Sequence, residues 1–118
     1  MKLTFIELPA FMDQIDKLGK PLSEAILSTI ENDLLKDPER GDVIKGTGGA
    51  RKGRIANPSK GKGKSGGFRY IYAYFQIHDR VYLFYLYEKK AQDDLTAGQT
   101  KMLAKVIKLT KENLKGVK

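Results

Sequence analysis

Residues 68–90 read FRYIYAYFQIHDRVYLFYLYEKK, two runs of aromatic and β-branched residues joined by a short polar link. Runs of this composition are typical of β-strands, so we expect strands over residues 68–76 and 81–87. The link, Ile77–Arg80, is short enough for a hairpin. A third strand is expected over residues 50–56, and the three together predict an antiparallel meander.

Helical patterns lie on either side of the expected meander. After a short strand over residues 2–7, apolar residues three and four apart predict one amphipathic helix over 8–19 and a second over 21–37. Thr96 and Gln99 have the spacing of a capping box, which predicts a last helix directly after them.

Length and composition predict a single domain. The chain has 118 residues, of which 41% are hydrophobic and 31% charged, so one core is possible and general disorder is not expected. We therefore predict one α+β domain over residues 1–118. An N-terminal strand and helical hairpin would pack on an antiparallel three-strand meander, followed by a C-terminal helix.

The positive charge is concentrated in one segment. The chain carries 22 Lys and Arg residues against 14 Asp and Glu, a net charge of +8. Between Asp42 and Asp79 there are eight of these cations and no acidic residue, which leaves 14 basic residues to balance the 14 acids elsewhere. A block of one sign indicates a polyanionic partner such as RNA. The alternative is a flexible basic loop that only aids solubility.

Several classes of site are not expected. The chain has no cysteine and one histidine, His78, so thiolate metal sites and a two-histidine ribonuclease site are excluded. His78 is expected in the hairpin turn, and no carboxylates are spaced for zinc. Asp93 and Asp94 are expected to be ordinary negative charges near a helix N-terminus. Glu7 and Pro9 interrupt the first apolar run, and no stretch approaches a membrane span, so we expect a cytoplasmic protein.

Cations on the expected strands form the candidate site. Lys52 and Arg54 are two residues apart and so share a face, Arg69 begins the next strand, and Lys89 and Lys90 follow the third. Fixed cations of this kind stabilise the negative charge that develops in phosphoryl transfer. Crowded cations also favour a neutral lysine, which can act as a base. A phosphate-binding surface without chemistry is equally compatible with this placement.

Four motifs carry a resemblance to a known family. GDVIKGTGG at 41–49, RKGR at 51–54, GKGKSGGFR at 61–69 and YEKK at 87–90 resemble the HigB branch of the RelE/ParE toxin superfamily. The resemblance spans roughly residues 40–107 and implies the RelE-like fold. It also implies a toxin that cleaves messenger RNA in the ribosomal A site. The implied partners are the 70S ribosome, messenger RNA and a HigA-like helix-turn-helix antitoxin, with no membrane, cofactor or metal.

The resemblance also suggests roles for the cations. Lys52 and Arg54 match the basic pair of the first meander strand, Arg69 matches an arginine that contacts the scissile phosphate, and Lys89 or Lys90 matches a proposed general acid. We expect the RNA 2′-hydroxyl to be the nucleophile, with Lys52 as base and Lys89 as the preferred acid. The residues expected to bind RNA or the ribosome are Arg51, Lys60, Lys62, Lys64 and Lys90.

Two other functions stay open at this point. One is a non-catalytic RNA- or ribosome-binding module that uses the same basic face. The other is a gyrase-directed toxin of the ParE type, against which the basic cluster argues.

Overall fold

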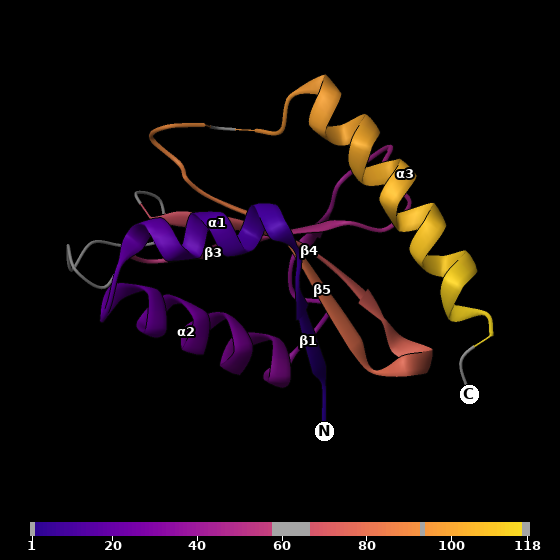
Figure 1. Cartoon of the computed structure of the whole chain (residues 1–118), viewed down its shortest axis with the longest axis horizontal. Helices are drawn as coiled ribbons and strands as arrows, with labels where there is room; N and C mark the ends of the chain where they lie inside the picture. Colours follow the sequence, from indigo (N-terminus) through magenta and orange to yellow (C-terminus); the bar gives the residue numbers. More distant parts are fainter. Residues whose placement is uncertain (1, 58–66, 93, 117–118) are drawn as a thin grey trace.

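A computed structural model describes residues 2–57, 67–92 and 94–116 of the chain. Helices lie on both sides of a central sheet, with α1 and α2 to the left and α3 to the right in Figure 1. The described elements are, in order, β1 (Thr4–Glu7), α1 (Pro9–Leu18), α2 (Leu22–Lys36), β2 (Asp42–Val43), β3 (Arg51–Ile55), β4 (Phe68–Phe75), the 3₁₀ helix η2 (Gln76–His78), β5 (Arg80–Glu88) and α3 (Ala97–Leu114). The α+β class predicted from the sequence is confirmed.

The sheet contains more than the expected meander. Within the described residues it has five strands in the order β1-β5-β4-β3-β2. β3, β4 and β5 pair antiparallel, as predicted. β1 pairs parallel to β5, and β2 pairs antiparallel to β3 inside the segment expected to be only a connector. The helical pair α1–α2 carries the chain from one edge of the sheet to the other, which makes these two additions possible.

Alternation along β4 divides the hydrophobic residues into two cores. Phe68, Tyr70 and Tyr72 point to one side and pack with α1 and α2. Ile71 and Ala73 point to the other side and pack with α3. β4 is therefore buried on both faces, which is why its sequence is apolar almost without interruption.

β5 contains one extra residue opposite β4. Ile71 lies opposite Tyr85, but the next residue of β4, Tyr72, lies opposite Leu83. Phe84 is thus the additional residue of a β-bulge, and it packs in the core beneath α3. The bulge shifts the alternation of side chains along β5. The face of the sheet to which each β5 residue points can therefore not be assigned from alternate positions alone.

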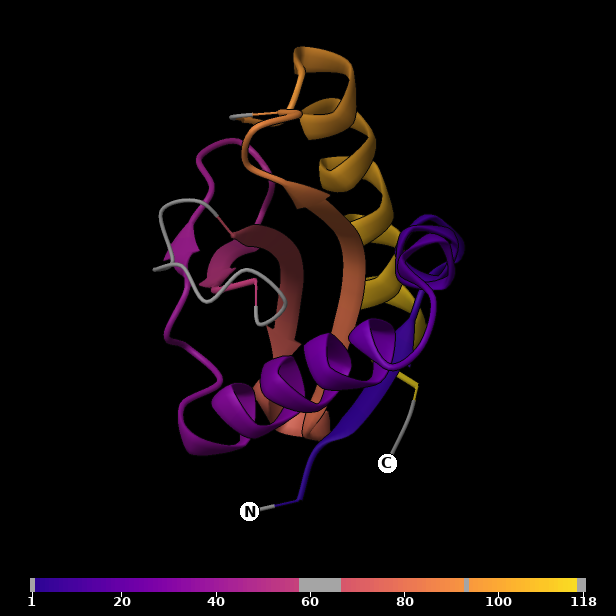
Figure 2. The same cartoon turned by 90° about the vertical axis from the view of Figure 1, so that its left-hand side faces the viewer.

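The last helix begins as the sequence predicts. The Thr96 hydroxyl accepts a hydrogen bond from the backbone N–H of Gln99 at 3.1 Å, and the Gln99 side chain accepts one from the Thr96 N–H at 2.9 Å. This is a complete capping box, which satisfies two N–H groups at the helix start. Figure 2 shows α3 behind the curved sheet, on the side away from α2. In the described part of the chain, no helix has the length and apolar character needed to cross a membrane.

Gly53 is required by the close approach of Tyr70. A Cβ atom placed on Gly53 would lie 2.2 Å from Cζ of Tyr70, which is buried beside it. We expect Gly53→Ala to reduce the free energy of unfolding by roughly 1–3 kcal/mol, the usual cost of forcing extra volume into a packed core. Urea unfolding of the purified protein measures this loss.

Gly98→Ala is the matched control. A Cβ atom on Gly98 would meet only the Thr96 hydroxyl, at the ordinary contact distance of 3.9 Å. This substitution should leave stability unchanged or raise it by roughly 0.4–1 kcal/mol, because it restricts the unfolded chain. Equal losses for the two variants would show that the Tyr70 contact is not the cause.

Candidate functional site

Strand register places three candidate residues in one row across the sheet. Arg54 on β3 lies opposite Arg69 on β4, and Arg69 lies opposite Tyr87 on β5. Lys52 lies two residues before Arg54 and so points to the same side of the sheet, the side that also packs with α3. We call Lys52, Arg54, Arg69 and Tyr87 the cationic face. Two neighbouring strands, β3 and β4, therefore bring together cations that are up to 17 positions apart in the sequence, and β5 adds Tyr87.

The two arginines of this row differ in exposure. Arg54, on β3, is exposed, whereas Arg69, on the central strand, is only 5% exposed. A guanidinium so well buried is held in place by its surroundings, and an incoming phosphate would meet Arg54 first. The sequence did not predict this difference, because it follows from the position of β4 inside the sheet.

Lys52 forms an ion pair that sequence analysis missed. Its Nζ atom donates to Oδ1 of Asp94 at 2.8 Å, which links β3 to the connector before α3. The Asp94 side chain is 78% exposed, and that of Lys52 is 29% exposed. The Lys52 nitrogen is therefore engaged by a carboxylate in the free protein, and its expected role as a base stays a prediction.

Hydrogen bonds hold Asp94 in position. The Gln92 side-chain amide donates to the backbone carbonyl of Asp94 at 2.9 Å and to the side chain of Gln99 at 2.8 Å. Gln99 belongs to the capping box at the start of α3. Asp94 is thus presented by a connector tied to the helix start. The only sequence signal for it was its proximity to a capping motif, which does not indicate a partner on β3.

Arg51 lies apart from the cationic face. It is opposite Tyr72 and therefore points to the α2 side of the sheet. Its guanidinium donates to the backbone carbonyls of Glu39 at 2.9 Å and Gly41 at 2.8 Å. These bonds hold the turn between α2 and β2, so the structure gives Arg51 a stabilising role in the fold. Binding of RNA by Arg51 stays a prediction.

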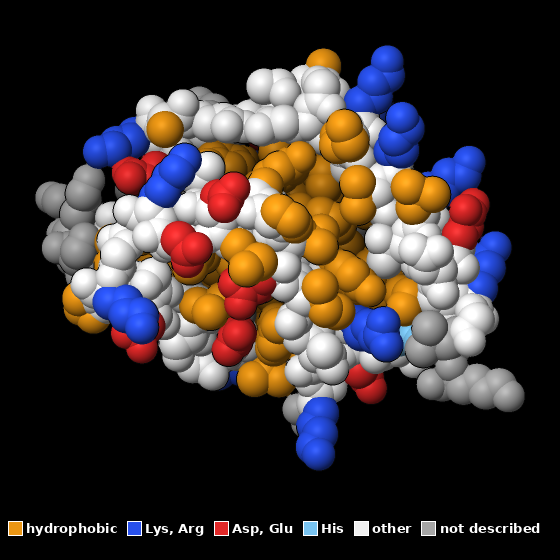
Figure 3. All heavy atoms as spheres, viewed as in Figure 1, with side chains coloured by type: hydrophobic (Ala, Val, Ile, Leu, Met, Phe, Trp, Pro, Cys, Tyr) orange, Lys and Arg blue, Asp and Glu red, His pale blue; other side chains and the backbone are white. Residues whose placement is uncertain are grey.

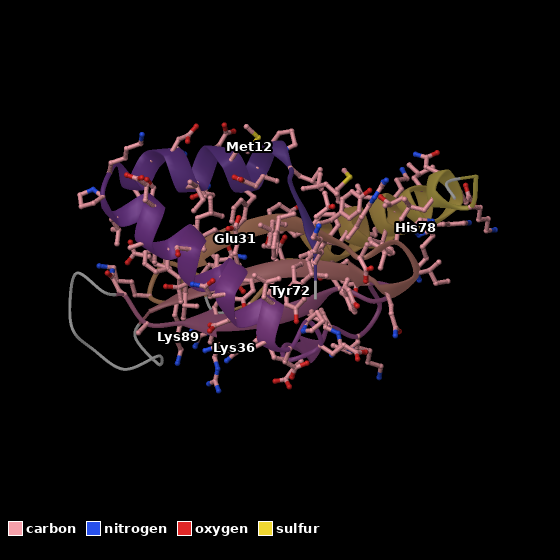
Figure 4. All side chains as sticks on the ribbon, turned by 90° about the horizontal axis from the view of Figure 1, so that it is seen from below. Met12, Glu31, Lys36, Tyr72, His78 and Lys89 are labelled. Atoms are coloured by element: carbon pink, nitrogen blue, oxygen red, sulfur yellow. The ribbon has the colours of Figure 1, made fainter. Side chains whose placement is uncertain are left out.

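Lys89 and Lys90 follow β5 at the end of the sheet nearest the cationic face. The Lys89 N–H donates to the Gly67 carbonyl at 3.1 Å, which extends the β4–β5 pairing. Lys90 is exposed and lies 3.6 Å from a carboxylate oxygen of Glu88. His78 ends η2 between β4 and β5 and so lies in the hairpin region, as predicted. Figure 4 shows it well away from Lys89, the candidate acid.

Other predicted residues have no described position. Lys60, Lys62 and Lys64 fall outside the described residues. Among the residues that are described, no three His, Asp or Glu side chains are grouped so that they could hold a metal ion. Besides Asp94, sequence analysis did not place Tyr87 in the site, because only the register across the bulge in β5 brings it opposite Arg69.

A hollow adjoins the cationic face at Tyr87. It has a volume of about 590 Å³ and lies between α1, β5 and the start of α3. Figure 3 shows hydrophobic side chains gathered in the middle of this view, between the regions of α1 and α3. The polar lining includes three amides and two charged side chains: Gln14, Gln92, Gln99, Lys17 and Glu88.

The Lys52 ammonium lowers the pKa of Asp94 below its ordinary value of 3.8, first by hydrogen bonding and then by its charge. We expect the Asp94 carboxyl carbon to titrate below this value in an NMR titration, and to return toward it in Lys52→Met. The depressed pKa means that the ion pair contributes stability above about pH 4, and that this contribution is lost as the pH falls through the folded-state pKa. Lys90→Met is the control and should leave the Asp94 titration unchanged.

Comparison with known proteins identifies the family. The sequence model of the RelE toxin of the RelE/RelB toxin–antitoxin system matches residues 20–117. A free E. coli RelE with two arginine-to-alanine substitutions is 15% identical, with a TM-score of 0.56 over 79% of this chain and 90% of that chain. Isolated E. coli RelE is 13% identical, with a TM-score of 0.55 over 89% and 99%. The toxin chain in the intact E. coli RelBE complex is 14% identical, with a TM-score of 0.53 over 72% and 94%.

At these identities the solved structures establish a shared fold. The family match covers most of the chain, including every strand of the cationic face. This protein therefore belongs to the RelE toxin family.

Proposed function

We propose that this protein is a ribosome-dependent endoribonuclease that cleaves translated messenger RNA in the ribosomal A site and so inhibits translation. Membership of the RelE toxin family supports the proposal. The observation that carries it is the row of Arg54, Arg69 and Tyr87 across three neighbouring strands. Fixed cations of this kind can stabilise the charge of a phosphoryl-transfer transition state.

The proposed reaction uses the RNA's own 2′-hydroxyl. Its oxygen gives up its proton to solvent water and bonds to the adjacent phosphorus while the bond to the 5′-oxygen breaks, which leaves a 2′,3′-cyclic phosphate and a 5′-hydroxyl. Arg54 and Arg69 hold the phosphate and its developing charge, and Lys89 protonates the leaving oxygen, with Lys90 as the second choice. Because the nucleophile belongs to the substrate, the reaction needs no metal-bound water.

We assign Lys52 to phosphate binding rather than to proton abstraction. A base must point its nitrogen at the proton that it removes, whereas the Lys52 nitrogen already contacts the Asp94 carboxylate at 2.8 Å. A lysine that binds one anion in the free protein is suited to exchange it for another. Lys60, Lys62 and Lys64 would bind the RNA or ribosomal backbone through long-range attraction, as exposed lysines do.

The expected partners are the 70S ribosome, messenger RNA and a neutralising antitoxin, with the cytoplasm as the compartment. The structure of the E. coli RelBE toxin–antitoxin complex supports an antitoxin for this chain as well. A HigA-like helix-turn-helix antitoxin is the form that the sequence resemblance implies.

The chemistry of the cut ends tests the proposed reaction. Programmed ribosomes incubated with the purified protein should yield cleaved messages with cyclic-phosphate and 5′-hydroxyl ends, detected by primer extension and end-specific ligation. Ends carrying a 3′-hydroxyl would contradict attack by the 2′-oxygen. Ribosome binding without any cleavage would favour the non-catalytic module, and inhibition of gyrase in a supercoiling assay would favour the ParE-like alternative.

Arg54→Ala tests the role of the row. Loss of a fixed cation at the developing charge should lower the single-turnover cleavage rate roughly 10²–10³-fold at saturating toxin, as removal of a comparable donor does elsewhere. Because Arg54 is exposed, its removal should leave the fold intact, which circular dichroism checks. Arg69→Ala is the less informative variant, because it also empties a buried position.

Arg80→Ala is the matched control for Arg54→Ala. Arg80 begins β5, opposite Phe75 and at the hairpin end of the sheet, so its loss removes the same charge away from the row. A cleavage rate equal to that of the unmodified protein is expected. If both variants slow cleavage alike, the effect comes from net charge and not from the row.

A further inference from the structure

Lys52 lies in the wall of two adjoining hollows. One has a volume of about 400 Å³ and is lined by Asp42, Val43, Ile44, Lys52, Asp94, Leu95 and Thr100. The other has a volume of about 150 Å³ and is lined by Arg40, Gly41, Asp42, Lys52, Gly53 and Arg54. A lysine side chain is long and flexible, so an ammonium at this position can serve either hollow.

The ammonium is held on the Asp94 side. Its bond to Asp94 measures 2.8 Å, whereas Arg54 forms no ion pair with any acidic residue of the described segments. Asp94 is largely exposed, and ion pairs between exposed groups contribute little to stability. Lys52 therefore has a well-defined partner in the free protein, and another anion can easily replace that partner.

The smaller hollow has the features of a phosphate site. Arg54 and Arg40 add guanidinium groups beside the Lys52 side chain. Two acids are also present: Arg40 lies 3.3 Å from Asp33, and Asp42 lines the hollow. Carboxylates balance these cations in the free protein, and an anion that exchanges with one of them meets a net positive charge.

We propose that the hollow between Arg40, Lys52 and Arg54 binds a backbone phosphate of RNA next to the scissile one, with Arg54 shared between the two phosphates, and that Asp94 is the carboxylate which this phosphate displaces from Lys52. Asp94 thus acts through Lys52: it holds the ammonium in the larger hollow until RNA arrives. The inference rests on the proposed function for the identity of the ligand. It adds Arg40 and Asp94 to the residues that act on RNA.

The need to displace Asp94 from Lys52 should lower the affinity of the protein for RNA. While Asp94 is paired with Lys52, an RNA phosphate must break that contact before it gains its own. Removing the carboxylate should tighten RNA binding, and it should leave one more cation to release counterions from the RNA. The salt dependence of binding should then become steeper by about 0.7 in the slope of log K against log salt, the value for one phosphate contact on a single strand.

A double-mutant cycle tests the proposal with a probe that cannot be cut. The probe is a fluorescent single-stranded RNA of about ten nucleotides with every 2′-hydroxyl methylated. Asp94→Asn should bind it about two- to fivefold more tightly than the unmodified protein, as expected for loss of one competing exposed ion pair. In a Lys52→Met background the same substitution should have no effect beyond that of the charge-matched control Asp13→Asn on α1.

Other variants locate the phosphate. Asp94→Glu keeps the carboxylate and should restore the weaker binding of the unmodified protein. Arg40→Gln should weaken binding about two- to fivefold, whereas Arg80→Gln at the far end of the sheet should not. Thermal unfolding of each variant confirms that the protein is folded.

The results separate this inference from the proposed function. Three results would overturn the displacement. The first is that Asp94→Asn still tightens binding in the Lys52→Met background. The second is that Asp94→Asn leaves the affinity unchanged, and the third is that neither protein binds the probe. An unchanged affinity in Arg40→Gln would overturn the location. The cycle does not depend on cleavage, so a protein that shows the coupling but never cuts RNA would refute the ribonuclease proposal and leave the phosphate site standing.

Discussion

β4 is buried on both faces, and this double burial limits the sheet to one register. A slip by one residue would move Tyr70 from the α2 side to the α3 side and send Ile71 the other way. It would also turn Arg69 into the core beneath α1 and α2. The close contact between Tyr70 and Gly53 adds a second limit, since any side chain on Gly53 would collide with the tyrosine ring. Packing and the placement of the site are therefore set by the same strand.

The three cations of β3 have different surroundings because alternate residues of a strand point to opposite sides of the sheet. Arg51 points toward α2 and holds the turn that leads into β2. Lys52 points to the other side and pairs with Asp94. Arg54 points the same way as Lys52 but is exposed and has no ion pair among the described residues. A basic motif that reads as uniform in the sequence thus contains one structural cation, one balanced cation and one that is open to a ligand.

The balance of charge around Lys52 suggests how a strongly basic protein keeps its proposed RNA site ordered while that site is empty. Cations crowded together repel one another, and a carboxylate within the cluster offsets that repulsion. Asp94 is supplied by the connector before α3, whose position depends on the capping box and on Gln92. The start of α3 and the cationic face are therefore linked through a single exposed ion pair. Such a link costs little to break, which suits a surface that must receive a polyanion.

The sequence by itself determined the main secondary-structure elements and the positive charge of the candidate site. Strand composition, helical periodicity and the Thr96–Gln99 spacing are local properties, and they predicted the α+β class, the meander and the start of the last helix. The acid-free segment predicted a polyanion-binding face. Spacing by two also placed Lys52 and Arg54 together, because alternation holds within any regular strand.

Only the tertiary structure decided which residues meet. The bulge at Phe84 sets which β5 residue lies opposite Arg69, and no local pattern encodes it. The Lys52–Asp94 pair joins residues 42 positions apart, and burial of Arg69 follows from the strands on either side of β4. The parallel pairing of β1 with β5 likewise depends on where the helical hairpin returns the chain. Contacts of this kind arise from the packing of distant elements, so their energies do not appear in any short stretch of sequence.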